Sequence, residues 1–301
     1  MNRREWLIAA AGTAAFPFAL REARAAGSIE SIDERFSLIT GLGGNILACN
    51  TGAGLVLTDS GNDSGTALLD TLAQMPGAAA VHTLINTHWH REQTAGNPAL
   101  GEAGARIVAH AKTHQHLRVG HYLRDEERYA APLPAAGVPG LRFYTTQSLE
   151  IGEISLDCGY LLEAHTDGDI YVRFPEQNLI AAGDAISPLR DPMLDWFGGG
   201  WIGGRLDSLA LLLEVSDAQT RFVPSYGPLV GRDYVEREHQ LMTTVFDRMV
   251  EFIRMGMSAE DCIEAGVMDG LGREFQAPLA FIDATHRSLW AHHNTLSHDI
   301  V

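Results

Sequence analysis

The sequence has few cysteines. Three occur in 301 residues, at Cys49, Cys158 and Cys262. No two of them form a Cys-x-x-Cys pair, and they are too few and too scattered for a disulfide framework. Cys49 and Cys158 lie in strand-like apolar runs, where we expect buried free thiols.

Positive charge is also scarce. Lys and Arg number 22 against 38 Asp and Glu, which gives a net charge of −16. An acidic surface repels phosphate backbones and anionic lipids, so we expect a small-molecule substrate rather than nucleic acid or a membrane as partner. Apolar residues make up 46% of the chain, enough for a sizeable core in one large α/β domain. Nothing in the sequence indicates the oligomeric state.

Long apolar runs are absent after the first residues. A twin arginine, Arg3-Arg4, is followed by an apolar run over residues 7–20 and by the small-x-small sequence Ala23-Arg24-Ala25. Because the run is short and contains Gly12 and Pro17, we do not expect a permanent transmembrane helix. We predict an export signal of the twin-arginine type over residues 1–25, cleaved near Ala25, and one domain over residues 26–301 in the bacterial periplasm. The general secretory route is the alternative.

Histidines follow a strand-like run at residues 81–85. His88 and His90 are two residues apart, so in an extended segment their side chains point to the same side. Neutral imidazole is the commonest protein ligand for zinc, and such a pair needs at least one further ligand. The candidates are His165 and Asp184, each at the end of a strand-like run.

Four motifs occur in a fixed order along the chain. They are His88-x-His90, then His165-Thr166-Asp167-Gly168-Asp169, then Ala182-Gly183-Asp184, then Val223-Pro224-x-x-Gly227-Pro228. In this order they resemble the metallo-β-lactamase superfamily of metal-dependent hydrolases, from about residue 28 onward. The resemblance implies an α/β fold, a four-layer αβ/βα sandwich with one or two zinc ions at the edge of its sheets. It also implies that His88, His90 and His165 hold the first metal and that Asp184 bridges to a second.

The positions of the second metal depart from the family pattern. Glu92-Gln93 stands where the family has Asp-His, and Tyr226 stands where it has a last histidine. Glu92 could ligate or act as an outer base, Gln93 offers a weak carbonyl ligand, and Tyr226 would have to lose a proton with a pKa near ~10. We therefore expect one tightly held zinc ion rather than two.

The predicted activity is hydrolysis by a metal-bound hydroxide. Asp184, with support from Glu92, would orient the nucleophile and accept its proton, and Tyr226 or Gln93 would donate a hydrogen bond to the developing oxyanion. The substrate could be an ester, thioester, lactone, lactam, phosphoester or sulfoester, because the fold does not decide among them. The alternatives are a non-hydrolytic metal-binding accessory protein of a periplasmic sulfur-oxidation or quinoprotein pathway, and an iron-dependent redox protein or dioxygenase.

Other segments are predicted from periodicity and turn residues. We expect the segment 119–146 to be an irregular connection that either covers the metal or is solvated. His114, His116 and His121 are expected at the surface, and Asp167 and Asp169 are expected to orient His165. A helix is predicted over residues 206–217 after a glycine-rich turn, and Asp195 near that turn could line the pocket.

Overall fold

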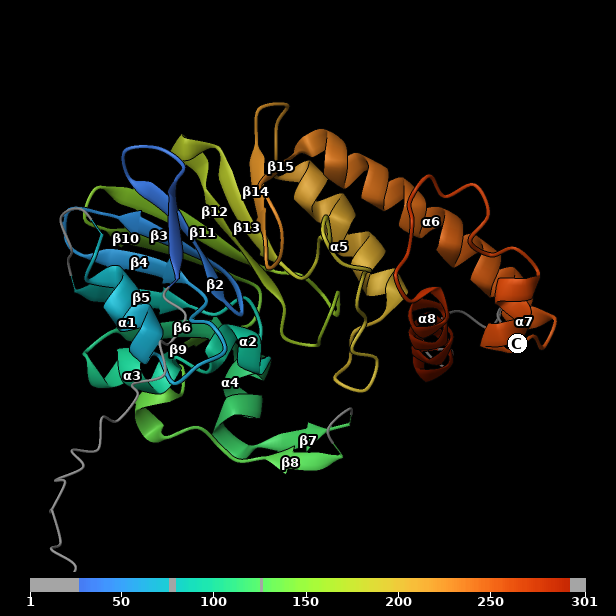
Figure 1. Ribbon diagram of the computed structural model, residues 1–301, viewed down its shortest axis with the longest axis horizontal. Helices are drawn as coiled ribbons and strands as arrows, with labels where there is room; N and C mark the ends of the chain where they lie inside the picture. Colours follow the sequence, from blue (N-terminus) through green and yellow to red (C-terminus); the bar gives the residue numbers. More distant parts are fainter. Residues whose placement is uncertain (1–26, 76–79, 125–126, 293–301) are drawn as a thin grey trace, which may run out of the picture.

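The computed structural model describes residues 27–75, 80–124 and 127–292. The export signal predicted for residues 1–25 lies outside this part of the chain. Helices cover two stacked β-sheets on their outer faces (Figure 1), so the predicted α/β class is confirmed. Among the described residues, no helix has both the length and the apolar character needed to cross a membrane.

The first sheet carries the strands that lead to the first two histidines. Its strands lie in the order β1-β2-β3-β4-β5-β6-β9. Neighbours from β1 to β4 are antiparallel, whereas β4, β5, β6 and β9 are parallel and are joined by helical crossovers. The strands are β1 (Ser28–Ser31), β2 (Phe36–Leu42), β3 (Gly44–Asn50), β4 (Leu55–Thr58), β5 (Val81–Ile85), β6 (Arg106–His110) and β9 (Leu141–Phe143).

The second sheet carries the segments that supply His165 and Asp184. It has the order β10-β11-β12-β13-β14-β15, and only β13 and β14 are parallel neighbours in it. A separate hairpin is formed by β7 (His121–Leu123) and β8 (Arg128–Ala130). The strands of the second sheet are β10 (Thr146–Ile151), β11 (Ile154–Tyr160), β12 (Ile170–Phe174), β13 (Leu179–Gly183), β14 (Arg221–Pro224) and β15 (Val230–Gly231).

The helices divide between the two sheets. Those before β7 belong to the first sheet, and α5 and α6 cover the second. Helix α8 packs on α5 and α6, and α7 packs on α8. The helices are α1 (Thr66–Leu72), α2 (Arg91–Thr94), α3 (Asn97–Glu102), α4 (Ala111–Val119), α5 (Ile202–Glu214), α6 (Arg232–Arg254), α7 (Ala259–Glu264) and α8 (Pro278–His292), with short 3₁₀ turns η1 (Ala135–Gly137) and η2 (Pro175–Gln177).

Apolar side chains fill three layers between these elements. In β2, Phe36 and Leu38 face the second sheet while Ile39 faces α1, because successive side chains of a strand alternate. The rings of Phe36 and Phe174 meet edge to face between the sheets, with centroids 4.9 Å apart. A further layer joins the second sheet to α5 and α6. The predicted four-layer αβ/βα sandwich is confirmed.

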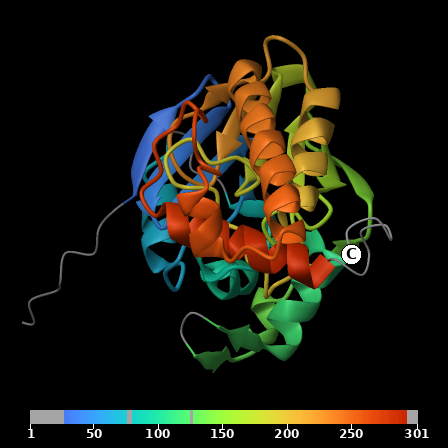
Figure 2. The same cartoon turned by 90° about the vertical axis from the view of Figure 1, so that its right-hand side faces the viewer.

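Two segments differ from the prediction. The region 119–146 is not irregular throughout, since it contains β7, β8, η1 and β9; strands of three residues are too short to show periodicity. Figure 2 shows the β7–β8 hairpin projecting away from the sheets. Helix α5 begins at Ile202, earlier than expected, and includes Gly203 and Gly204. Glycine is a poor helix former. A Cβ at Gly204 would lie 2.4 Å from the carbonyl oxygen of Glu163, so close packing requires glycine at this position of the helix.

Candidate metal centre

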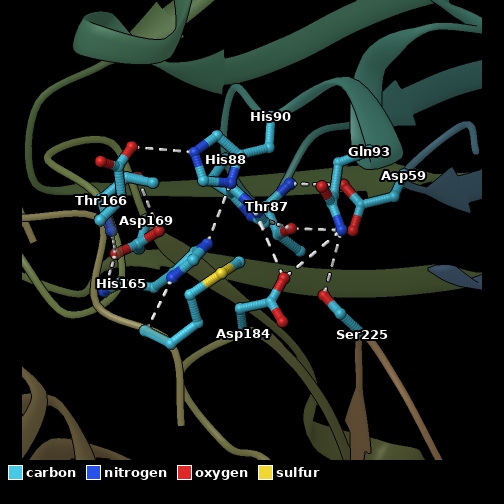
Figure 3. A network of polar contacts seen from close by, with 12 residues as sticks. Asp59, Thr87, His88, His90, Gln93, His165, Thr166, Asp169, Asp184 and Ser225 are labelled. Carbon is cyan, nitrogen blue, oxygen red and sulfur yellow. Dashed lines mark hydrogen bonds and ion pairs between the residues drawn. The ribbon is translucent and has the colours of Figure 1, made fainter. Parts of the chain in front are cut away.

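Three histidines meet at the edge of the two sheets. His88 and His90 follow β5, and His165 lies in the loop between β11 and β12 (Figure 3). One ring nitrogen of each lies within 4.8 Å of the others. Nδ1 of His90 is 3.0 Å from Nε2 of His165, and His88 and His165 are fully buried. The sequence prediction that these side chains converge is confirmed.

His90 and His165 are oriented through their outward nitrogens. Nε2 of His90 lies 3.0 Å from Oδ2 of Asp195, and Nδ1 of His165 lies 2.9 Å from the carbonyl oxygen of Met193. Each ring therefore donates one N–H to an acceptor and turns its other nitrogen toward the cluster. Such partners fix the tautomer and the direction of a metal-binding imidazole.

His88 is oriented through Thr87. The backbone N–H and the hydroxyl of Thr87 both donate to the buried carboxylate of Asp59, at 2.7 and 2.8 Å. The Thr87 hydroxyl oxygen lies 3.1 Å from Nδ1 of His88 and can accept its proton. Nε2 of His88 is left buried, without a hydrogen-bond partner in the described part of the chain.

This orphaned nitrogen indicates that the cluster fits a metal ion. A buried polar atom without a partner costs free energy, and a cation that accepts its lone pair removes that cost. Three imidazoles with their free nitrogens facing one point are a common donor set for zinc. His88, His90 and His165 would hold the ion.

The three imidazoles differ in how readily they take a proton. Burial lowers the pKa of His88 well below its ordinary value, and the neighbouring imidazoles act in the same direction. Burial also lowers the pKa of His165. Burial acts the same way on His90, but the hydrogen bond and charge of Asp195 prevail and raise the pKa of His90.

Asp184 and Gln93 lie on the other side of His88. Oδ2 of Asp184 is 3.6 Å from Nε2 of His88. The amide nitrogen of Gln93 is 3.4 Å from that same oxygen and 3.4 Å from the hydroxyl of Ser225 (Figure 3). Gln93 thus presents donors toward Asp184. If the Gln93 amide were flipped, its oxygen would face the Asp184 carboxylate, and the two oxygens would repel each other.

Glu92 and Tyr226 lie at the border of the site. Glu92 is exposed on α2 and does not join the histidine cluster. The guanidinium of Arg190 lies over the ring of Tyr226, 3.5 Å from its centroid. Burial, with the charges of Asp184 and Glu92, raises the pKa of Tyr226 to about 12. The phenol therefore keeps its proton at neutral pH and can donate a hydrogen bond.

Sequence reasoning did not find the role of Asp195, which was expected only to line a pocket. It reaches His90 from a loop without periodic pattern, so no sequence signal marked it. His116 and His121, which were expected at the surface, are half-buried, and both rings pack 4.4 Å from the ring of Trp89. His116 also lies 3.0 Å from Oδ1 of Asp167, which accepts the indole N–H of Trp89.

Asp169 supports His165 through the backbone. Its Oδ2 accepts the N–H groups of His165 and Thr166, at 2.6 and 2.7 Å, and its Oδ1 accepts the hydroxyl of Thr166. These bonds close the tight turn that carries His165, as the sequence analysis expected for this aspartate.

Known proteins share this fold. The family model described as the metallo-beta-lactamase superfamily matches residues 39–229. A curated relative, the metallo-beta-lactamase type 2 of Bacillus sp. (strain 170), is 29% identical over 140 residues, which cover 46% of this chain and 49% of the relative. The match thus spans about half the length of that relative.

Two solved structures extend the comparison. A metallo-beta-lactamase from Pontibacter korlensis has a TM-score of 0.59 at 20% identity, over 72% of this chain and 99% of that chain. The inverting sec-alkylsulfatase Pisa1 from Pseudomonas sp. has a TM-score of 0.67 at 15% identity, over 87% of this chain and 50% of that one. At these identities the structures show a shared fold, while the family model shows membership. The chain belongs to the metallo-β-lactamase superfamily.

Proposed function

We propose that this protein is a zinc-dependent hydrolase that works with one zinc ion on a small ester, thioester, lactone, lactam, phosphoester or sulfoester. The observation that carries the proposal is the unpartnered Nε2 of His88, buried where His90 and His165 turn their own free nitrogens. A zinc ion bound there would supply Lewis acidity and lower the pKa of a coordinated water to about 7.

The residues around the cluster have separate parts in this proposal. Asp184, whose carboxylate reaches to 3.6 Å from His88, would accept a proton from the attacking water and orient it. Tyr226 keeps its proton because its pKa is raised, so it would donate a hydrogen bond to negative charge that develops on the substrate. Gln93 would hold Asp184 in place through its amide N–H.

Three features support one ion rather than two. Gln93 turns donors toward Asp184, Tyr226 resists losing the proton that ligation would require, and Glu92 is exposed and apart from the histidine cluster. A second divalent ion needs several oxygen or nitrogen acceptors at this place. At two of these positions Gln93 offers a neutral amide and Tyr226 a protonated phenol, both weaker metal ligands than histidine.

We also propose that the protein acts in the bacterial periplasm. Support comes from the sequence alone, through the twin arginine, the apolar run and the Ala23-Arg24-Ala25 sequence. Fusion of residues 1–30 to a reporter that is active only after export would test this proposal. Cytoplasmic retention of the fusion would contradict it.

The hydrolase proposal is tested by a substrate panel on the zinc-loaded protein. Ester, thioester, lactone, lactam, phosphoester and sulfoester substrates are compared between wild type, His88→Ala and the matched control His82→Ala. The control changes an exposed histidine on β5, the strand that leads to His88. We expect one class to be turned over by wild type and His82→Ala, and by neither apo protein nor His88→Ala. Zinc bound without turnover of any class would instead favour the metal-binding accessory protein.

A further inference from the structure

A cavity beside the metal centre has walls from three separate parts of the chain. It measures about 740 Å³ and lies between the β7–β8 hairpin, residues 191–197 and α8. Pockets for small organic ligands typically measure about 300–1,000 Å³. Trp89, His90 and Glu92 also line it, so a molecule in this cavity would touch residues that adjoin the metal ligands.

Ring side chains are left accessible at this cavity. Phe197 is 53% exposed, and its ring lies edge-on to Tyr122 of the hairpin and to Trp196, with both centroid distances 6.0 Å. Met193, 52% exposed, lines the same cavity. A single exposed apolar residue is ordinary, but a group of them around one cavity indicates a binding surface. Aromatic walls favour ligands with flat rings, which they contact face to face or edge to face.

Two arginines, Arg91 and Arg124, line this cavity together with Glu92 and three aspartates. Most acidic side chains that line it already have partners. The pairs are Asp195 with His90, Asp283 with Arg287, and Asp191 with the backbone N–H groups of Gln276 and Ala277. Arg91 and Arg124 have no carboxylate partner among the described residues, and the guanidinium of Arg124 lies 4.7 Å from the centroid of the Trp196 ring. Among the described lining residues, Glu92 is the carboxylate without a hydrogen bond or ion pair of its own.

We propose that this cavity binds the non-reacting part of the substrate, and that this part is an aromatic ring with an anionic group. The ring would contact Tyr122, Trp196 and Phe197, and the anion would pair with Arg124. The inference rests on the proposed function, because it places the bond to be broken beside His90. Binding of the ring and anion does not itself require turnover, so the two can be tested apart.

The test uses 2-naphthalenesulfonate, a ring-bearing anion that has no hydrolysable bond. Its binding to the full chain is measured by isothermal titration calorimetry, beside neutral 2-naphthalenemethanol, ring-free methanesulfonate and flexible 1-octanesulfonate. We expect one 2-naphthalenesulfonate per chain, weaker binding of 2-naphthalenemethanol and 1-octanesulfonate, and no measurable binding of methanesulfonate. Absence of 2-naphthalenesulfonate binding, or equally tight binding of 1-octanesulfonate, would overturn the proposal.

Variants locate the site. Phe197→Ala and Tyr122→Ala should each raise the Kd for 2-naphthalenesulfonate about 10-fold, because each removes ring contact. Arg124→Met should raise it about 3-fold without changing the Kd for 2-naphthalenemethanol. The matched controls Tyr144→Ala, 72% exposed outside the cavity, and Arg118→Met on α4 should leave both Kd values unchanged. Equal Kd values in all variants would refute the site.

Two further outcomes separate this inference from the hydrolase proposal. If removing the metal abolishes 2-naphthalenesulfonate binding, the anion binds the metal rather than Arg124, and the inference is overturned while the hydrolase proposal stands. If the anion binds as expected but no substrate class is turned over, the hydrolase proposal fails and the binding site stands.

Discussion

At the scale of single residues, each metal-facing nitrogen depends on an acceptor behind the same ring. Asp195 stands behind His90, the Met193 carbonyl behind His165, and the Thr87 hydroxyl behind His88. Only the Asp195 contact involves a charged side chain, and it raises the pKa of His90 against the effect of burial. We therefore expect the loss of Asp195 to weaken metal binding more than the loss of either of the other two acceptors.

Asp195→Asn is expected to weaken zinc binding about 10- to 100-fold, the usual effect of losing a carboxylate behind a metal-binding histidine. The Asn side chain can still accept a hydrogen bond from His90 but carries no charge. Competition with a chromophoric zinc chelator measures the change. Glu176→Gln, an exposed acidic position far from the centre in sequence, is the matched control. Equal zinc affinity in Asp195→Asn and wild type would contradict this role.

The buried carboxyl group of Asp59 leads to a prediction about how the free energy of unfolding depends on pH. Burial raises the pKa of its carboxyl to about 8, although two hydrogen bonds from Thr87 oppose the rise. In the unfolded chain the same group loses its proton near ~4. Between these values the folded state holds more protons, so this group makes the free energy of unfolding fall as pH rises from about 4 to about 8.

Asp59→Asn should therefore make that fall with pH less steep in the metal-free protein. Urea unfolding at a series of pH values measures it, and Asp70→Asn, which changes an exposed carboxylate on α1, serves as control. A slope equal to that of wild type would show that Asp59 does not hold its proton as described.

The residues of the site differ in how well the sequence predicts them, because some lie in short motifs after strands and others lie in irregular loops. His88, His90, His165 and Asp184 were predictable because each follows a strand and belongs to a short motif. Asp195 was not, because it lies in a loop whose position is set by contacts distant in sequence. Its backbone N–H donates to the His165 carbonyl at 2.9 Å, a contact that no local pattern encodes.

At the scale of elements, the glycine-rich turn before α5 is pressed against the loop of His165. A Cβ at Gly200 would lie 2.0 Å from the carbonyl oxygen of His165, which is backbone and cannot move without shifting the ligand. The glycine-rich turn was predicted from the sequence, but its contact with His165 was not. The structure shows that Gly200 packs directly against the backbone of the third histidine.

Gly200→Ala is expected to lower zinc affinity at least about 10-fold and to destabilise the protein by about 1–3 kcal/mol through overpacking. Gly140→Ala is the matched control, since a Cβ there meets nothing within 4 Å. Chelator competition and urea unfolding measure the two effects. A Gly200→Ala variant that behaves like Gly140→Ala would show that the turn can move away freely.

A buried ion pair ties α5 and α6 to the loop after β13. Arg205 and Glu238 are fully buried, with their charged groups 2.6 Å apart. Arg205 also donates to the carbonyl oxygen of Asp184 at 2.8 Å, and Glu238 accepts the N–H of Ser187 at 3.0 Å. The helical layer thereby positions the carboxylate beside His88.

Arg205→Met should destabilise the protein by about 3 kcal/mol, because it leaves the Glu238 carboxylate buried without its partner. Arg237→Met on the same helix as Glu238 removes an exposed pair with Asp233 and should cost less than about 1 kcal/mol. Urea unfolding of zinc-saturated protein compares them. Equal costs for the two variants would mean that water reaches the Arg205–Glu238 pair.

At the scale of the whole molecule, the two sheets and the metal site at their edge were predictable, while the cavity beside that site was not. Short apolar runs between turns indicated strands, and the αβ/βα sandwich was implied by the family that the order of the motifs resembles. The β7–β8 hairpin and the 191–197 loop help to line the cavity beside His90. Strands of three residues are too short to show periodicity, and the loop has no regular structure. The cavity beside the metal centre is therefore lined by the parts of the chain that sequence patterns describe least.

The most direct test of the account is the zinc content of the purified full chain by elemental analysis, after exposure to excess zinc and removal of unbound ions. One zinc per chain in wild type, about one in Gln93→Ala and none in His88→Ala is the expected result, because three histidines hold the ion and Gln93 does not. Two zinc ions per chain in wild type, or one retained in His88→Ala, would contradict the single three-histidine centre.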